Sequence, residues 1–210
     1  DLAPVWRSKS AHPKQDELIT PYVDEHKNST SHPHSASDST PAPGILQMDW
    51  ESLKSTVSTC VACPLSQTRT QTVFGVGDEQ ADWLFIGEGP GAREDATGEP
   101  FVGQAGKLLD QMLAAIKLKR GDQVYITNIV KCQPYLTRQI QLIKPKLIVA
   151  LGKVASQNLL QSDDSISSLR GKAHDYCGIP LIVTYHPAYL LRALSEKAKA
   201  WKDLCFAVSI

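Results

Sequence analysis

The sequence contains no apolar stretch close to the ~20 residues that a membrane-spanning helix needs, and it does not open with a signal peptide. We therefore expect a cytoplasmic protein with no membrane partner. The formal net charge is zero, because 22 Lys and Arg residues balance 22 Asp and Glu residues. Bulk electrostatics thus neither favours nor excludes nucleic acid, and any basic surface must be local. The first residue is not Met, so we expect the translated protein to begin upstream.

Cysteine is scarce and odd in number, with five residues in a chain of 210. An odd and small number of cysteines argues against a fold held together by disulfide bonds. Two of the five form Cys60-Val61-Ala62-Cys63, and a C-x-x-C pair is typical of a metal or redox site in a reducing compartment.

Residues 1–48 have little apolar periodicity. The stretch 28–44, NSTSHPHSASDSTPAPG, cannot bury enough surface to offset the entropy of ordering it. We expect residues 1–48 to be a disordered or low-complexity N-terminal extension. Within it, residues 2–7 (LAPVWR) are either a docking peptide or an ordinary terminal remnant.

A helical pattern begins after residue 48, with Asp49 expected as its N-cap and with Trp50, Leu53 and Val57 on one face. Four apolar runs then follow that are typical of buried parallel strands, with amphipathic segments between them. The runs are 83–87, 124–130, 146–152 and 180–186.

This alternation predicts one α/β domain over residues 49–210, with a four-stranded, mainly parallel twisted sheet and helices on both faces. In the last helix, after Ser195, the spacing predicts a buried apolar face: Ala198, Trp201, Leu204, Cys205 and Val208. Ligands of such sheets bind beyond the carboxyl ends of the strands. That rule selects three loops, at 87–103, 128–134 and 185–192.

The first loop, GEGPGAREDATGEPFVG, matches the dinucleotide fingerprint G-x-G-x-x-A loosely. Glu94 and Asp95 would repel a pyrophosphate, so we expect no nucleotide cofactor. A tight structural turn would explain the glycines but not Phe101. An aromatic side chain in a stiff loop at the ligand edge is suited to stacking on a flat ring.

The other two loops also carry polar side chains to this edge. Asn128 can donate and accept hydrogen bonds together, as the edge of a pyrimidine requires, or it can simply cap the strand end. His186 is either a second polar group of the site or a structural residue before Pro187. Residues 189–192 (YLLR) suit a wedge into a base stack with a phosphate anchor, or the start of a buried helix.

Four motifs in this order resemble the iron–sulfur, or family-four, uracil-DNA glycosylases of bacteria. They are GEGPGAREDATGEPFVGQAG, TNIVKCQP, ALGKVA and VTYHPAYLLR, and the similarity runs from about Trp50 to the C-terminus. The resemblance implies a monomeric DNA-repair enzyme that flips uracil out of single- or double-stranded DNA and hydrolyses its N-glycosidic bond. It would leave an abasic site in base-excision repair. The alternative is a degenerate member that binds DNA or a partner without cleaving.

The resemblance also implies residue roles. Phe101 would stack on the flipped uracil, Asn128 would bond its O4 and N3–H, and His186 would donate to O2 as negative charge develops. Gly89 would line the pocket and help to hold the water with its backbone. The remaining implied roles are thymine exclusion by Glu94, loop support by Glu88, and DNA contact by Tyr189, Leu190, Leu191, Arg192 and Lys131.

In that family a [4Fe–4S] cluster has four cysteine ligands, and Cys60, Cys63 and Cys132 match three of them. The fourth lies in a segment after KCQP that is absent here, since Pro134 runs directly into YLTRQIQLIKP. Either the segment is deleted in this protein or the present sequence omits it, and we expect the point where the two flanks join, at Pro134, to lie in a loop. Cys177 and Cys205 are poor substitutes, because Cys205 is expected to be buried and Cys177 to lie far from the other ligands.

Overall fold

The structure is a computed structural model that describes residues 44–129 and 133–210. Most of the predicted N-terminal extension therefore lies outside the described residues, as do Lys131 and Cys132. Of the extension, the described part includes a short 3-10 helix, η1 (Ile45–Gln47), in which Ile45 is buried against Leu53 and Val57.

The described residues form a sheet of six strands in the order β1-β3-β2-β4-β6-β5. The four predicted strands are its parallel centre: β2 (Trp83–Gly87), β3 (Val124–Asn128), β4 (Leu147–Leu151) and β6 (Ile179–Thr184). Each of them is buried over most or all of its length, which is why each appears in the sequence as an apolar run.

The prediction of four strands was wrong in number, because an antiparallel strand lies at each edge. These are β1 (Val76–Gly77), which pairs with β3, and β5 (Ala173–Tyr176), which pairs with β6. Neither has an apolar run, since β1 has two residues and β5 is half exposed. The β5–β6 turn has positive φ at Cys177 (52°) and Gly178 (85°), as two-residue hairpin turns require.

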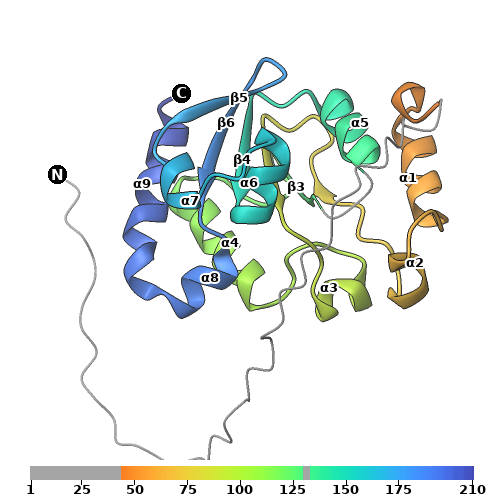
Figure 1. The fold of residues 1–210 in the computed structure, drawn as a ribbon, viewed down its shortest axis with the longest axis horizontal. Coiled ribbons are helices and arrows are strands. Elements are labelled where there is room, and N and C mark those ends of the chain that lie inside the picture. The colour runs from red at the N-terminus through yellow and green to blue at the C-terminus, as the bar shows by residue number, and fades with distance from the viewer. Residues whose placement is uncertain (1–43, 130–132) are drawn as a thin grey trace, which may run out of the picture. The chain divides into compact units, whose positions relative to one another are not determined.

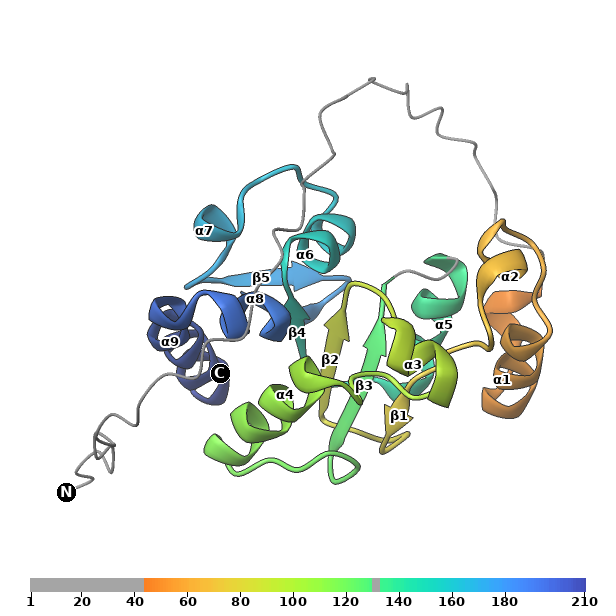
Figure 2. The same ribbon diagram turned by 90° about the horizontal axis from the view of Figure 1, so that it is seen from below.

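Helices cover both faces of the sheet, as predicted (Figures 1 and 2). Helices α4 (Gln104–Ala115) and α9 (Lys197–Val208) pack on one face against Phe85, Val149 and Ile182. Helices α5 (Gln133–Ile143), α6 (Lys153–Leu160) and α7 (Ile166–Leu169) pack on the other. The shorter elements are α2 (Leu65–Thr68), α3 (Ala92–Thr97), α8 (Pro187–Arg192) and η2 (Leu194–Glu196).

The predicted first helix is α1 (Trp50–Ser58), and its N-cap is confirmed because Asp49 Oδ1 accepts the Ser52 N–H at 2.8 Å. The joint at Pro134, however, lies in the first turn of α5 and not in a loop. Proline fits there because the first N–H groups of a helix have no intrahelical partner. None of the helices in the described ranges has the length and apolar character needed to span a bilayer.

The predicted apolar face of α9 was wrong at four of its five positions. Ala198, Trp201, Cys205 and Val208 are exposed, whereas Leu204 is buried as predicted, together with Ala200, Asp203 and Ala207. The reason is Asp203, a buried carboxylate that accepts the hydroxyl of Thr184 at the end of β6 and so turns its side of the helix toward the sheet. The small alanines on that side allow close packing on the sheet. Cys205 is thus an exposed thiol and not a core residue.

Candidate active site

The carboxyl ends of β2, β3, β4 and β6 lie at one edge of the sheet, and the three predicted loops all start there. Gly87 at the end of β2 is in register with Asn128 at the end of β3. The pairing of β4 with β6 places Thr184 at the same edge, and the chain after Thr184 leads to His186. The sheet therefore gathers the predicted polar groups from three separate segments.

Phe101 lies directly against the end of β2. A Cβ atom on Gly87 would stand 2.4 Å from Phe101 Cζ and 2.9 Å from Asn128 Oδ1, so only glycine allows the ring and the amide to approach there. Phe101 is 6% exposed and has a φ of 57°, a left-handed conformation that bulky residues seldom adopt. Its ring is thus held in one place against the strand end.

Arg120 stabilises this conformation and was not predicted from the sequence. Its guanidinium donates to the carbonyl oxygens of Pro100 (2.8 Å) and Phe101 (2.9 Å), and it pairs with Asp110 at 3.0 Å. No sequence signal could have found Arg120, because it is 19 residues from Phe101 and belongs to no motif.

Asn128 is 1% exposed, and its Oδ1 is a buried oxygen that lacks a hydrogen-bond partner in the described part of the chain. Leaving such a group unpaired costs roughly 1–3 kcal/mol of stability. An unsatisfied buried polar group in a native protein calls for an explanation, and a catalytic or ligand-binding role is one of the few available. The alternative role of Asn128, a simple strand cap, does not account for the missing partner.

His186 is the N-cap residue of α8. Its Nδ1 accepts the backbone N–H of Ala188 at 3.1 Å, which places the proton of a neutral ring on Nε2. Burial, and to a lesser degree the nearby Arg192 guanidinium, lower the pKa of His186 below its ordinary value. The ring stacks on Phe101 with centroids 5.5 Å apart. The site therefore holds a neutral imidazole with an N–H available for donation.

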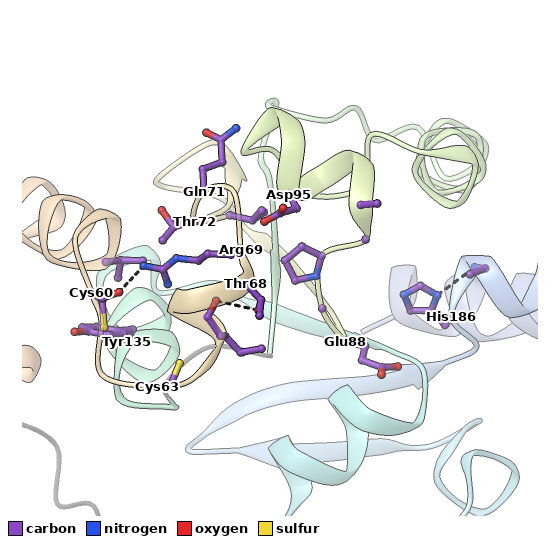
Figure 3. Close-up of a pocket in the computed structure, with 18 of the residues that line it drawn as sticks. Cys60, Cys63, Thr68, Arg69, Gln71, Thr72, Glu88, Asp95, Tyr135 and His186 are labelled. Atoms are coloured by element: carbon purple, nitrogen blue, oxygen red, sulfur yellow. Dashed lines mark hydrogen bonds between the residues drawn. The ribbon is translucent and has the colours of Figure 1, made fainter. Parts of the chain in front are cut away.

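A cleft of about 760 Å³ opens onto this edge (Figure 3). Glu88 and His186 line one part of it, and Cys60 and Cys63 line the opposite part. Gly89 also lines the cleft. Glu88 is exposed and Gly89 is half-buried. Phe101 and Asn128 are buried and are not among the residues that line the cleft.

Glu94 holds the glycine loop together rather than lining the cleft. Its carboxylate accepts backbone N–H groups of Val102 (3.0 Å), Gly103 (3.0 Å) and Gly91 (3.2 Å). Burial alone would raise the pKa of Glu94, but these backbone donors together lower it below its ordinary value. Asp95 ties the same loop to the chain after α2 by accepting the Thr70 N–H at 2.9 Å.

This geometry makes loop stability depend on pH. A lowered pKa in the folded state means that Glu94 stabilises the protein above its unfolded pKa, about 4.3, and loses this effect as pH falls through the folded value. We expect Glu94→Gln to lower Tm by a constant amount at neutral pH, and this difference should shrink below about pH 4. The exposed Glu99→Gln serves as a control in the same loop. A Tm difference that persisted unchanged to about pH 2 would contradict this role.

The predicted DNA wedge lies on α8. Tyr189 and Leu191 are 41% and 42% exposed, and Arg192 is exposed beside the cleft. Leu190 instead packs inside the domain with Tyr185 and Ala200. Tyr189 and Leu191 are therefore the apolar side chains that α8 presents at the surface.

Comparison with known proteins gives a consistent result. The uracil DNA glycosylase superfamily model matches residues 74–206. The type-4 uracil-DNA glycosylase of Archaeoglobus fulgidus is 42% identical, over 64% of this chain and 79% of the relative. That of Thermotoga maritima is 40% identical (68% and 83%), and that of Pyrobaculum aerophilum is 35% identical (75% and 92%). The chain belongs to the uracil-DNA glycosylase superfamily and, within it, to the type-4 family.

Proposed function

We propose that this chain is a uracil-DNA glycosylase, which takes uracil out of the DNA stack and hydrolyses its N-glycosidic bond. The observation that carries the proposal is the unpaired Oδ1 of Asn128, buried beside Phe101 at the ligand edge of the sheet. The ring N–H at position 3 of uracil is a donor for this oxygen, and the Asn128 amide N–H donates to the O4 carbonyl. Phe101 offers an apolar ring for stacking.

His186 supplies the chemistry at the other side of the base. The bond between uracil N1 and sugar C1′ breaks with its electron pair moving to the base. The hydroxyl of water adds at C1′ to leave an abasic site, and the water proton ends on the released uracil. The Nε2–H of neutral His186 donates to uracil O2, where the negative charge gathers. No carboxylate stands at the Gly89 position of the loop, so we propose that stabilising the departing anion contributes more than activating the water.

Specificity follows from the same contacts. Cytosine has an acceptor at position 3 and a donor at position 4, which reverses the pattern that Asn128 satisfies. A site built to form specific hydrogen bonds rejects such a mismatch by orders of magnitude. We propose that Glu94 and Glu88 act by holding the glycine loop around the base, and that Glu94 also crowds the methyl position of thymine.

DNA is bound without regard to sequence in this proposal. Arg192, beside the cleft, contacts backbone phosphate, and Tyr189 and Leu191 support the gap left in the stack. Lys131 has the same phosphate role but lies outside the described residues. The enzyme acts as a monomer, without a nucleotide cofactor.

The function is tested with labelled oligonucleotides that carry one uracil, cytosine or thymine at the same position. The intact chain is expected to generate an alkali-labile abasic site at uracil alone, in single- or double-stranded DNA. If the folded chain bound these oligonucleotides but left every base in place, a non-cleaving DNA-binding role would replace the enzyme.

The iron–sulfur cluster implied by the family is a separate proposal. Cys60 and Cys63 are half-buried free thiols on one part of the cleft, a suitable start for a cluster site. The described residues alone do not complete it, since they contain no group of three or more His, Cys, Asp or Glu side chains placed to hold a metal. Cys132 lies outside the described residues, and Cys177 and Cys205 are exposed thiols on β5–β6 and α9. The catalytic steps proposed above need no group from the cluster.

We propose that Cys60, Cys63 and Cys132 hold this cluster. The iron content of cysteine variants tests this assignment. Iron and inorganic sulfide, measured on protein purified without air, should fall strongly in Cys60→Ser and Cys132→Ser and stay unchanged in the control Cys177→Ser. Equal iron in all four proteins would remove the cysteine assignment.

A further inference from the structure

A buried ion pair with no part in the chemistry described above is bonded to the end of β6, two residues before His186. Asp203 of α9 is 1% exposed, and both of its oxygens are engaged. Arg170, which follows α7, donates from Nε to Oδ2 at 3.0 Å and from its terminal NH2 to Oδ1 at 2.7 Å. Two parallel bonds of this kind fix the direction of both side chains.

The same carboxylate holds the end of β6. Thr184, the last residue of that strand, is fully buried and donates its hydroxyl to Asp203 Oδ2 at 2.8 Å. His186 is two residues further along the chain. The bond therefore fixes the point from which the chain turns toward the imidazole.

Arg170 also contacts the residue between Thr184 and His186. Its guanidinium lies 5.2 Å from the centroid of the Tyr185 ring, and Tyr185 in turn packs against Tyr189 with ring centroids 5.2 Å apart. The ion pair thus reaches both the segment that leads to His186 and the exposed wedge of α8.

Stability alone is a weak reason for this arrangement. Taking a carboxylate and a guanidinium out of water costs several kcal/mol each, and apolar side chains of similar size are often as stable or more so. Burial raises the pKa of the Asp203 carboxyl, and the contacts from Thr184 and Arg170 oppose that shift. What apolar side chains would not supply is a directional anchor for the Thr184 hydroxyl.

We propose that Asp203 and Arg170 are positioning residues that act through Thr184 and Tyr185 to aim the Nε2–H of His186 at the leaving base. This proposal deepens the proposed function and rests on it. One side of His186 is closed by Gly152, the residue after β4, where a Cβ would stand 2.8 Å from His186 Cβ. With that side closed, a shift of the strand end changes where the ring points.

The test is a double-mutant cycle on the single-turnover rate of uracil release. Asp203→Asn, which keeps the shape and removes the charge, should slow release by about 10-fold to 100-fold, because small displacements of a catalytic group have effects of this size. In a His186→Ala background the same change should have almost no further effect. Thr184→Val, which removes one hydroxyl and leaves the ion pair, should behave likewise, and Thr184→Ser should restore the rate.

Ile143→Ala is the control, because it opens a cavity in the core on the opposite face of the sheet. It should lower Tm but leave the rate close to that of the unmodified chain. If Asp203→Asn slowed release equally with and without His186, or if Ile143→Ala slowed it as much, the positioning role would be overturned.

A second measurement separates this proposal from the proposed function. In the imidazole nitrogen NMR spectrum, the His186 signals should report an N–H on Nε2 in the unmodified chain and should shift in Asp203→Asn. If the unmodified chain released no uracil, the glycosylase proposal would fail while this readout still tested the positioning role. Unchanged His186 signals in Asp203→Asn would overturn it.

Discussion

His186→Ala is expected to slow single-turnover release of uracil by about 100-fold to 1000-fold, equal to roughly 3–4 kcal/mol of transition-state stabilisation. The neutral ring presents Nε2–H because Nδ1 already accepts the Ala188 N–H. Alanine removes this donor, and the negative charge on the departing base then has no partner at O2. DNA affinity should change little, since the donor acts mainly when the bond breaks.

The control for this prediction is His174→Ala. His174 is the other histidine in the described part of the chain, on β5, where its Nε2 lies 2.6 Å from the Leu169 carbonyl oxygen. Its loss should leave the rate nearly unchanged. A similar drop in both variants would indicate a general loss of fold rather than a missing donor.

Asn128→Leu is expected to abolish recognition of uracil without loss of stability. Leucine has nearly the same size but forms neither bond to the base, so release of uracil should fall by about 100-fold or more. Because Oδ1 is buried and unpaired, its removal should not lower Tm. It should leave the free energy of unfolding unchanged or raise it by up to about 1–3 kcal/mol. Urea unfolding and single-turnover kinetics on the same preparation measure both effects.

Gln139→Leu is the matched control, since Gln139 is also a buried amide but is satisfied. Its Nε2 donates to the Phe74 carbonyl oxygen at 2.9 Å. Here leucine should lower Tm and leave uracil release nearly unchanged. The opposite response of these two buried amides would identify Asn128 as a binding residue; a drop in Tm for Asn128→Leu like that of Gln139→Leu would show that its amide is structural.

The central sheet and the meeting of three loops were predictable from the sequence, because strands buried on both faces must be apolar throughout. Residues 83–87 and 124–128 show this directly. Since the strands run parallel, their polar ends meet at one edge wherever the crossovers place them. That is why Asn128 and His186 were predicted at a common site from positions 58 residues apart.

The parts that were not predictable depend on single tertiary contacts. The edge strand β5 leaves no apolar run because half of it faces water. The orientation of α9 follows from one buried carboxylate, Asp203, whose partner Arg170 is 33 residues earlier in the chain. The hydrogen bond from Arg120 to the Phe101 carbonyl oxygen likewise leaves no local pattern in the sequence. Periodicity averages over a helix or strand, so it does not detect such pairs.

The most direct test of the account is binding of the product uracil at the sheet edge that holds Phe101, Asn128 and His186, monitored by NMR on the intact chain. The Asn128 side-chain amide signal, assigned with the Asn128→Leu variant, and the His186 ring signal should both shift when free uracil is added and should not shift with cytosine. Shifts confined to other residues, in a chain that still released uracil from DNA, would place the base elsewhere and contradict the assignment of this edge as the active site.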